Sequence, residues 1–348
     1  MTLPLGRIGS ACLLLGALAP SLMLAQGQPT GTVIASNMGD NTASVIDAAS
    51  GRTIATLPTG DGPHEVAVSH DGRWATVSNY GTRGKNGSTI TVIDVAAHLV
   101  SRTIDLQQYQ RPHGMAFLPG DTLLVVTSET SRLLLIVDFR SGAVLRTIPT
   151  NGRTTHMLGV SADGKTIVAS NVSDGTIGVM HSASPDSAKI IRVARQPEGI
   201  AISPDGATAW VGSNRDSVVL VVDLARATPI DTLRGFGFPY RMAITPDGRR
   251  AVISDPPNGQ VRIYNAATRQ QESIVNVPRD SILGTTEFPS SPSPEGITIT
   301  RDSRFAFVTL QGRSRLITID LSRGTIVGWA VTGTSSDGVG FSQLTTKP

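Results

Sequence analysis

The chain has 348 residues, a formal net charge of +3, 4% aromatic residues and 16% charged residues. Glycine (36 residues) and proline (21 residues) are frequent, and no segment keeps the apolar spacing of an amphipathic helix, which favours an all-β fold with many tight turns. The cationic residues are scattered without a run of like sign, so the sequence carries no specific nucleic-acid signal.

Residues 1–25 have the pattern of a signal peptide, with Arg7 followed by an apolar segment that ends near Ala25. We therefore expect a secreted or periplasmic protein that has no membrane span after cleavage and folds as one domain over residues 26–348. Cys12 is the only cysteine, so a mature chain would contain no disulfide and no thiolate metal ligand. The sequence also has no C-x-x-C-H motif, and we expect no covalent haem.

Six copies of one pattern follow, beginning with GPHEVAVSHDGRWATVSN (62–79) and RPHGMAFLPGDTLLVVTS (111–128). In each copy two apolar runs flank a turn, which is Asp-Gly in four copies and predicts a β-hairpin. We call the second residue of each copy the anchor. The anchors lie 42 to 55 residues apart and are Pro63, Pro112, Thr155, Pro197, Pro239 and Pro294.

A third apolar run follows each copy, as in TVID (91–94), and a fourth comes after it, as in RTIDLQ (102–107). Four short strands repeated at this spacing predict the blades of a propeller. The segment before Pro63 supplies strands two to four of one more blade, and SSDGVGFSQ (335–343), with Ser336 as its anchor, supplies a first strand. We therefore predict an all-β, seven-bladed β-propeller with four-stranded antiparallel blades, closed by pairing of these two segments.

The runs DGRWATVSN and DGKTIVASN, together with third strands such as SVID (44–47), resemble the YVTN β-propeller repeat family. This resemblance covers nearly all of the chain after residue 25 and implies the same architecture. It does not select a function, because propellers of this kind serve as binding proteins, as electron-transfer enzyme domains and as lactonases.

The residue after the anchor is never apolar, and three of the six histidines occupy it in consecutive repeats. Because the first strand of a blade lines the central channel, we expect these side chains at the channel mouth. The insertions at 81–88 and 278–293 are expected on the same face. The seven residues are His64, His113, His156, Glu198, Tyr240, Glu295 and Asp337.

The first interpretation of this arc is a metal site, because three imidazoles that converge on one axis suit a divalent transition metal such as Zn, Cu, Ni or Fe. Carboxylates from the following repeats would complete the coordination, and an open position would allow Lewis-acid chemistry. The expected ligands are His64, His113, His156, Glu198, Glu295 and Asp337.

The second interpretation is a metal-free pocket for an anionic small molecule, because arginines lie close to the histidines in sequence. The stretch RPHGMAF (111–117) is similar to lactonase-type propellers, a similarity that implies a hydrolase or lyase with a histidine as base. The expected ligand contacts are Arg111, Arg153, Arg195, Tyr240, Arg241 and Glu65.

The third interpretation is a non-catalytic scaffold, in which polar residues of the channel satisfy one another and the face binds a protein partner. We expect a monomer in each case, and the sequence leaves open whether the protein is an enzyme. The aspartates at the ends of third strands are expected to cap turns; they are Asp47, Asp94, Asp138, Asp223 and Asp320.

Overall fold

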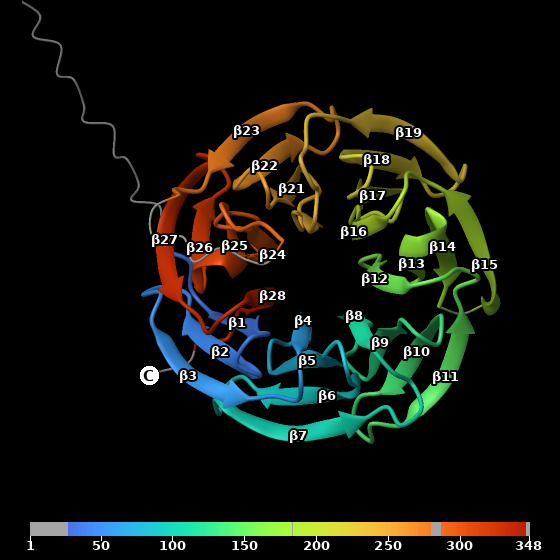
Figure 1. The fold of residues 1–348 in the computed structure, drawn as a ribbon, viewed down its shortest axis with the longest axis horizontal. Helices are drawn as coiled ribbons and strands as arrows, with labels where there is room; N and C mark the ends of the chain where they lie inside the picture. The colour runs from blue at the N-terminus through green and yellow to red at the C-terminus, as the bar shows by residue number, and fades with distance from the viewer. Residues whose placement is uncertain (1–26, 183, 280–286, 346–348) are drawn as a thin grey trace, which may run out of the picture.

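In the part of the chain that the structure describes, twenty-eight β-strands form seven four-stranded antiparallel sheets that are arranged as a ring (Figure 1). The computed structural model describes residues 27–182, 184–279 and 287–345, with the side chains of residues 184–187 excepted. The predicted signal peptide therefore lies outside the described residues. Within the described residues, no helix is long and apolar enough to span a membrane.

We number the blades by their inner strands in chain order. Blade 1 contains β4 (Pro63–Val68), β5 (Trp74–Gly81), β6 (Asn86–Asp94) and β7 (Leu99–Asp105). Blade 2 contains β8 (Pro112–Phe117), β9 (Leu123–Ser128), β10 (Leu133–Asp138) and β11 (Val144–Pro149). Blade 3 contains β12 (Thr155–Val160), β13 (Thr166–Asn171), β14 (Thr176–His181) and β15 (Ser184–Arg192), with the short 3-10 helix η1 (Val172–Asp174) before β14.

Blade 4 contains β16 (Pro197–Ile202), β17 (Thr208–Ser213), β18 (Val218–Asp223) and β19 (Thr228–Leu233). Blade 5 contains β20 (Met242–Ile244), β21 (Arg250–Asp255), β22 (Gln260–Asn265) and β23 (Gln271–Asn276). Blade 6 contains β24 (Pro294–Ile299), β25 (Phe305–Leu310), the 3-10 helix η2 (Gln311–Arg313), β26 (Arg315–Asp320) and β27 (Thr325–Val331). Blade 7 contains β28 (Ser336–Ser342), β1 (Thr32–Asn37), β2 (Thr42–Asp47) and β3 (Thr53–Pro58).

Blade 7 closes the ring with strands from both ends of the chain, as the sequence predicts. Strand β28 pairs antiparallel with β1, and the register places Val33 opposite Phe341 and Ile34 opposite Gly340. In Figure 1 the red β28 therefore lies next to the blue β1, between the inner strands β24 and β4. The closure leaves no inner strand unpaired among the seven sheets of the described residues.

The hydrophobic core is divided into clusters between the faces of neighbouring blades. In the described residues seven such clusters occur, one at each junction of the ring, and the aliphatic side chains come from alternating positions of the strands. At the closing junction, for example, Ile34 and Ala43 of blade 7 pack against Val77 and Ile93 of blade 1. Each blade is thus held by two neighbours, which fixes the inner strands around the channel.

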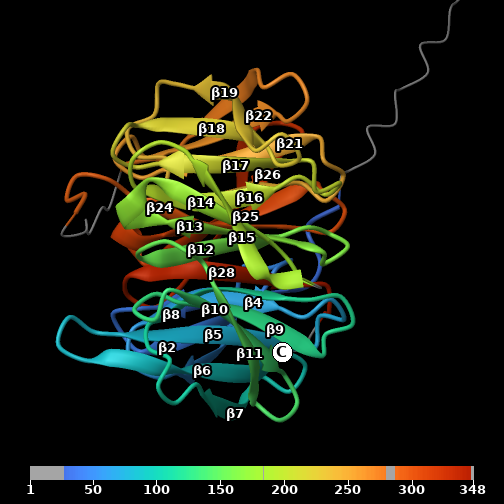
Figure 2. The same cartoon turned by 90° about the vertical axis from the view of Figure 1, so that its right-hand side faces the viewer.

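The strands cross the ring from one face to the other, so that the loops gather on its two faces (Figure 2). The anchors and the loops after the second strands share one face, since the Tyr80 amide donates to the Gly62 carbonyl and the Glu129 amide to that of Arg111. We call this side the anchor face. The predicted caps are confirmed at the ends of third strands, where Asp138, for instance, accepts from the Ser141 amide.

A hydroxyl group one residue before the end of the second apolar run of the repeat connects neighbouring segments around the channel. In four blades of the described residues this hydroxyl accepts a hydrogen bond from the amide of the second residue after the anchor; the donors are the amides of Glu65, Met157, Arg241 and Gly296. At three junctions a hydroxyl donates to a carbonyl of the next blade: Ser36 to His64, Thr127 to His156 and Thr309 to Asp337. These bonds fix the backbone of three of the predicted site residues.

Neighbouring inner strands approach so closely that the second position after the anchor is usually glycine. A Cβ atom at Gly199 would lie 2.3 Å from the Tyr240 carbonyl oxygen, and one at Gly338 would lie 2.2 Å from that of His64. Glycine also occupies this position at 114 and 296, whereas Glu65, Met157 and Arg241 replace it in the other three blades. A side chain can therefore occupy this position only where the neighbouring inner strand lies farther away.

We predict that Gly199→Ala destabilises the fold by about 1–3 kcal/mol, because the new methyl group would collide with the Tyr240 backbone. Gly84→Ala is the matched control, since a Cβ at Gly84 meets nothing within 4 Å. Urea unfolding of both variants measures the difference. Equal stability of the two variants would contradict the close approach of the inner strands.

Candidate functional site

The inner strands bring the residues after the anchors to the channel at the anchor face. Six anchors begin an inner strand, and the residue before each of these six has a left-handed backbone with φ between 49° and 59°. Blade 5 differs, because β20 starts only at Met242. There the Asp255 carboxylate accepts from the Gly237 and Phe238 amides, and the segment before β20 follows a different path.

An ion pair spans the channel between blades 5 and 1. The Arg241 guanidinium donates to Glu65 Oε1 from Nε at 2.9 Å and from Nη2 at 2.7 Å, and its Nη1 lies 3.1 Å from Glu198 Oε1. Its carbon Cζ is 4.1 Å from the centre of the Tyr240 ring. Arg241 is only 4% exposed, so its charge is balanced by these two carboxylates rather than by water.

His156 is held between two carboxylates through both ring nitrogens. Nδ1 lies 2.8 Å from Glu129 Oε2, and Nε2 lies 2.7 Å from Glu198 Oε1. Burial alone would lower the pKa of His156, but the charges of Glu198 and Glu129 outweigh it and raise the pKa to about 9. The carboxylate of Glu198 in turn has its pKa lowered to about 2, against the effect of burial, by His156 and Arg241. At neutral pH His156 is an imidazolium.

The other two histidines of the arc are neutral. Burial lowers the pKa of His64 to about 4 and that of His113 well below its ordinary value. The His113 ring lies against the ring of His156, with centroids 3.7 Å apart and the ring planes tilted by 33°, and its buried Nδ1 has no hydrogen-bond partner among the described residues. His64 Nδ1 lies 3.0 Å from the Gly62 carbonyl oxygen, which can only accept, so Nδ1 carries the hydrogen and Nε2 keeps its lone pair.

Two carboxyl groups complete the ring beside Arg241. Asp337 is 1% exposed, and burial together with the charge of Glu65 raises its pKa to about 7. Burial and the neighbouring Asp337 raise the pKa of Glu295 well above its ordinary value, and Glu295 Oε1 accepts a hydrogen bond from Ser293. The buried Oδ1 of Asp337 has no partner among the described residues. Near neutral pH these two carboxyl groups therefore hold protons that exposed aspartate and glutamate would have lost.

Tyr80 and Glu129 belong to the site, although the sequence analysis did not single them out. The Tyr80 hydroxyl lies 2.9 Å from both Glu129 oxygens, and burial followed by the charge of Glu129 raises the pKa of Tyr80 to about 12. Both residues come directly after the second apolar run of the repeat, which ends at Asn79 and at Ser128, although β5 itself continues to Gly81. Comparing that repeat position across blades could have found them, because it faces the residue after the anchor.

A cavity of about 430 Å³ opens on the anchor face beside His64. Its polar side chains include those of His64, Tyr80, Arg83 and Arg111. The Arg111 guanidinium stacks 4.5 Å from the centre of the Tyr80 ring, and its Nε donates to Asn86 in the inserted loop 81–88. The insertion 81–88 therefore forms part of the wall of the cavity beside His64. In the second insertion, 278–293, residues 280–286 lie outside the described residues.

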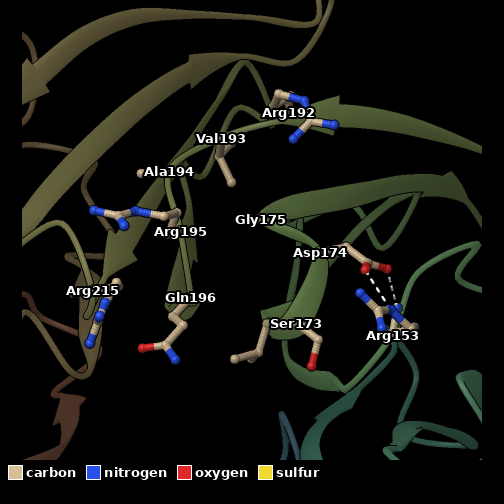
Figure 3. Close-up of a pocket in the computed structure, with 11 residues that line it drawn as sticks. Arg153, Ser173, Asp174, Gly175, Arg192, Val193, Ala194, Arg195, Gln196 and Arg215 are labelled. Atoms are coloured by element: carbon tan, nitrogen blue, oxygen red, sulfur yellow. Dashed lines mark hydrogen bonds and ion pairs between the residues drawn. The ribbon is translucent and has the colours of Figure 1, made fainter.

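The predicted cationic side does not form one surface. Arg241 joins the histidines, and Arg111 lies at the cavity beside His64. Arg153 and Arg195 instead line a different cavity of about 650 Å³ between blades 3 and 4 (Figure 3). Of the predicted ligand contacts, Glu65, Tyr240 and Arg241 thus lie in the channel network, and the other three lie around it.

Two of the predicted metal ligands, His156 and Glu198, are engaged in hydrogen bonds and ion pairs in this structure. Both nitrogens of His156 are hydrogen-bonded to carboxylates, and Glu198 is shared by His156 and Arg241. Across the described ranges of the chain, no group of three or more His, Cys, Asp or Glu side chains is arranged to hold a metal ion. Metal binding through His64, His113, His156, Glu198, Glu295 and Asp337 stays a prediction.

Comparison with known proteins identifies the architecture. No protein-family model matches the chain, and no curated protein matches it. Among solved structures, a chain of Kuenenia stuttgartiensis hydrazine synthase is similar with a TM-score of 0.66 and 18% identity, covering 79% of this chain and 88% of that one. A functionally unknown protein from Desulfotomaculum acetoxidans has a TM-score of 0.74 and 13% identity, covering 90% and 99%. Identities this low show the propeller fold alone, and the YVTN resemblance stays a resemblance in sequence pattern.

We predict that His156→Gln lowers the free energy of unfolding at pH 7 by about 3–5 kcal/mol, because it leaves Glu129 without its cation and Glu198 with Arg241 alone. The folded-state pKa of His156 lies above its unfolded value of about 6.5, so its contribution is complete below that pH and is lost as the pH rises through about 9. Chemical unfolding from pH 6 to pH 10 should therefore show a loss in the wild type that the variant lacks.

The control for this experiment is His70→Gln, since His70 is half exposed and pairs with Asp121 on the surface. Its effect should stay within about 1 kcal/mol. Parallel pH profiles of the wild type and His156→Gln would show that His156 does not carry the buried proton.

Proposed function

We propose that the protein is a secreted or periplasmic ligand-binding propeller that takes up a small hydroxycarboxylate in the cavity beside His64. The observation that carries this proposal is the combination of groups around that cavity: two arginines and a neutral histidine with a free lone pair. A volume of about 430 Å³ suits a small molecule.

The two kinds of group select different parts of the ligand. Arg111 is held in place by its stacking on Tyr80 and its hydrogen bond to Asn86, and it offers further N–H donors to a carboxylate. Arg83, which is exposed on the inserted loop, adds a second positive charge. His64 Nε2 can accept a hydrogen bond from a ligand hydroxyl, because its Nδ1 hydrogen is already donated to Gly62.

Calorimetry with matched ligand pairs tests this division. We expect L-malate to bind at least about tenfold more tightly than succinate, and glycolate more tightly than acetate, because only the first of each pair has a hydroxyl for His64. His64→Phe should abolish the preference, and Arg111→Ala should weaken both members of each pair.

The matched control is Arg153→Ala, which removes an arginine of the anchor face that does not line this cavity. It should bind like the wild type. Equal affinity for both members of each pair, or an unchanged preference in His64→Phe, would overturn the assignment of His64.

A second candidate function is the binding of a divalent transition metal. The observation in its favour is that His64 and His113 are both neutral, with ring centroids 5.2 Å apart. Neutral imidazole is the form that binds metals. Elemental analysis of protein purified without chelator or affinity tag, beside His64→Ala/His113→Ala, separates the candidates. Stoichiometric metal that is lost in the double variant would favour the metal site, whereas metal-free wild type that still prefers L-malate favours the metal-independent pocket.

The hydrolase or lyase alternative rests on Asp337, whose pKa of about 7 suits an acid or base at neutral pH better than that of His64. Turnover of a lactone that Asp337→Asn abolishes would establish catalysis. A scaffold would instead show no small-molecule binding and would retain a protein partner on the anchor face.

A further inference from the structure

The cavity between blades 3 and 4 has four arginines around it and belongs to neither the channel network nor the His64 pocket. Figure 3 shows Arg195 and Arg215 on one side of this cavity and Arg153 and Arg192 on the other. They come from different segments: the entries to β12 and β16, the end of β15, and the loop after β17. The lining includes no lysine.

Two of these arginines, in consecutive repeats, are each fixed by an aspartate. Asp174 accepts from the backbone amide and from Nε of Arg153, each at 2.7 Å. Asp216 accepts from the amide of Arg195 at 2.8 Å and from its Nε at 2.7 Å. Arg195 Nη2 also lies 2.5 Å from Asp216 Oδ1. These contacts hold each guanidinium at the entry to an inner strand, and since the two terminal nitrogens of an arginine carry four N–H groups, donors remain for a ligand.

The other two arginines add two further positive charges to the cavity. Arg192 and Arg215 are exposed, and neither forms an ion pair within the described residues. Four guanidinium charges against the two carboxylates leave a local net charge of +2. Planar guanidinium groups pair best with the oxygens of phosphate and carboxylate, and two excess charges call for a ligand with at least two negative charges.

We propose that this cavity, lined by Arg153, Arg192, Arg195 and Arg215, is a separate binding site for a small ligand that carries two linked phosphate groups. Its volume of about 650 Å³ exceeds that of the His64 pocket and leaves room for an organic group beyond the phosphates. The site shares no residue with that pocket, so it does not depend on the function proposed for it.

Titration calorimetry with inorganic pyrophosphate at low ionic strength tests the proposal. We expect one pyrophosphate per chain and at least a tenfold weaker affinity in Arg192→Ala/Arg215→Ala, whose exposed positions leave the fold intact by thermal unfolding. The control double variant Arg140→Ala/Arg226→Ala removes the same charge elsewhere on the surface and should bind like the wild type. No binding to the wild type, or equal loss in the control, would overturn the site.

Inorganic sulfate distinguishes a two-phosphate site from a general anion site. Sulfate is expected to bind at least tenfold more weakly than pyrophosphate, because it can engage only one side of the cavity. Equal affinity for the two anions would overturn the requirement for two linked phosphates.

The role of the aspartates has its own test. Asp216→Asn removes one negative charge beside the cavity but weakens the hold on the Arg195 guanidinium. If fixed arginines make the site, pyrophosphate binding weakens at least threefold. Tighter binding would show that charge alone is responsible and would overturn the role assigned to the Arg–Asp pairs.

Discussion

Hydrogen bonds from second-strand hydroxyls set how closely neighbouring inner strands approach around the channel. Ser36, Thr127 and Thr309 each donate to the carbonyl of a residue that follows an anchor in the next blade. The short distance between inner strands excludes a Cβ at four positions, and glycine fills them. The chemistry of the mouth therefore rests on a rigid ring of backbone, which holds its side chains in place before any ligand arrives.

The charges of the mouth follow from the two places where that glycine is replaced by a charged residue. Glu65 and Arg241 occupy the same repeat position in blades 1 and 5, and their side chains meet across the channel at 2.7 Å. Arg241 also holds Glu198, which in turn holds His156 together with Glu129. A buried carboxylate without a cation would cost several kcal/mol, so this chain of contacts stabilises the proton on His156. The three histidines consequently divide into one structural imidazolium and two neutral rings.

The repeat pattern was sufficient to predict the fold because every blade repeats the same apolar runs and the same turn. Blade number, strand order and ring closure all follow from the anchors and from the Asp-Gly turns. The site could be predicted only in part. The position after the anchor does point to the channel, but the pattern treats His64, His113 and His156 as equivalent. Their protonation depends on Glu129, a neighbour from the loop after another strand, and this pairing appears only when the blades are assembled.

The arginines show a second property that the sequence could not predict, namely where their side chains lie relative to the channel. Arg111, Arg153 and Arg195 all lie close to anchors, which suggests one cationic surface. Their side chains do not gather in one place, because Asp174 and Asp216 fix two of them at the cavity between blades 3 and 4, whereas Arg111 stacks on Tyr80 beside His64. Proximity in a repeat therefore places a residue on a face of the ring but not at a given distance from its axis.

The most direct test of this account is the protonation state of the imidazoles at pH 7, measured by long-range ¹H–¹⁵N NMR with each signal assigned through a single histidine substitution. The account predicts that His156 is protonated on both nitrogens, while His64 and His113 are neutral and His64 carries its hydrogen on Nδ1. A neutral His156, or three equivalent neutral rings, would contradict the division of roles within the arc and would return the three-histidine metal centre as the leading interpretation.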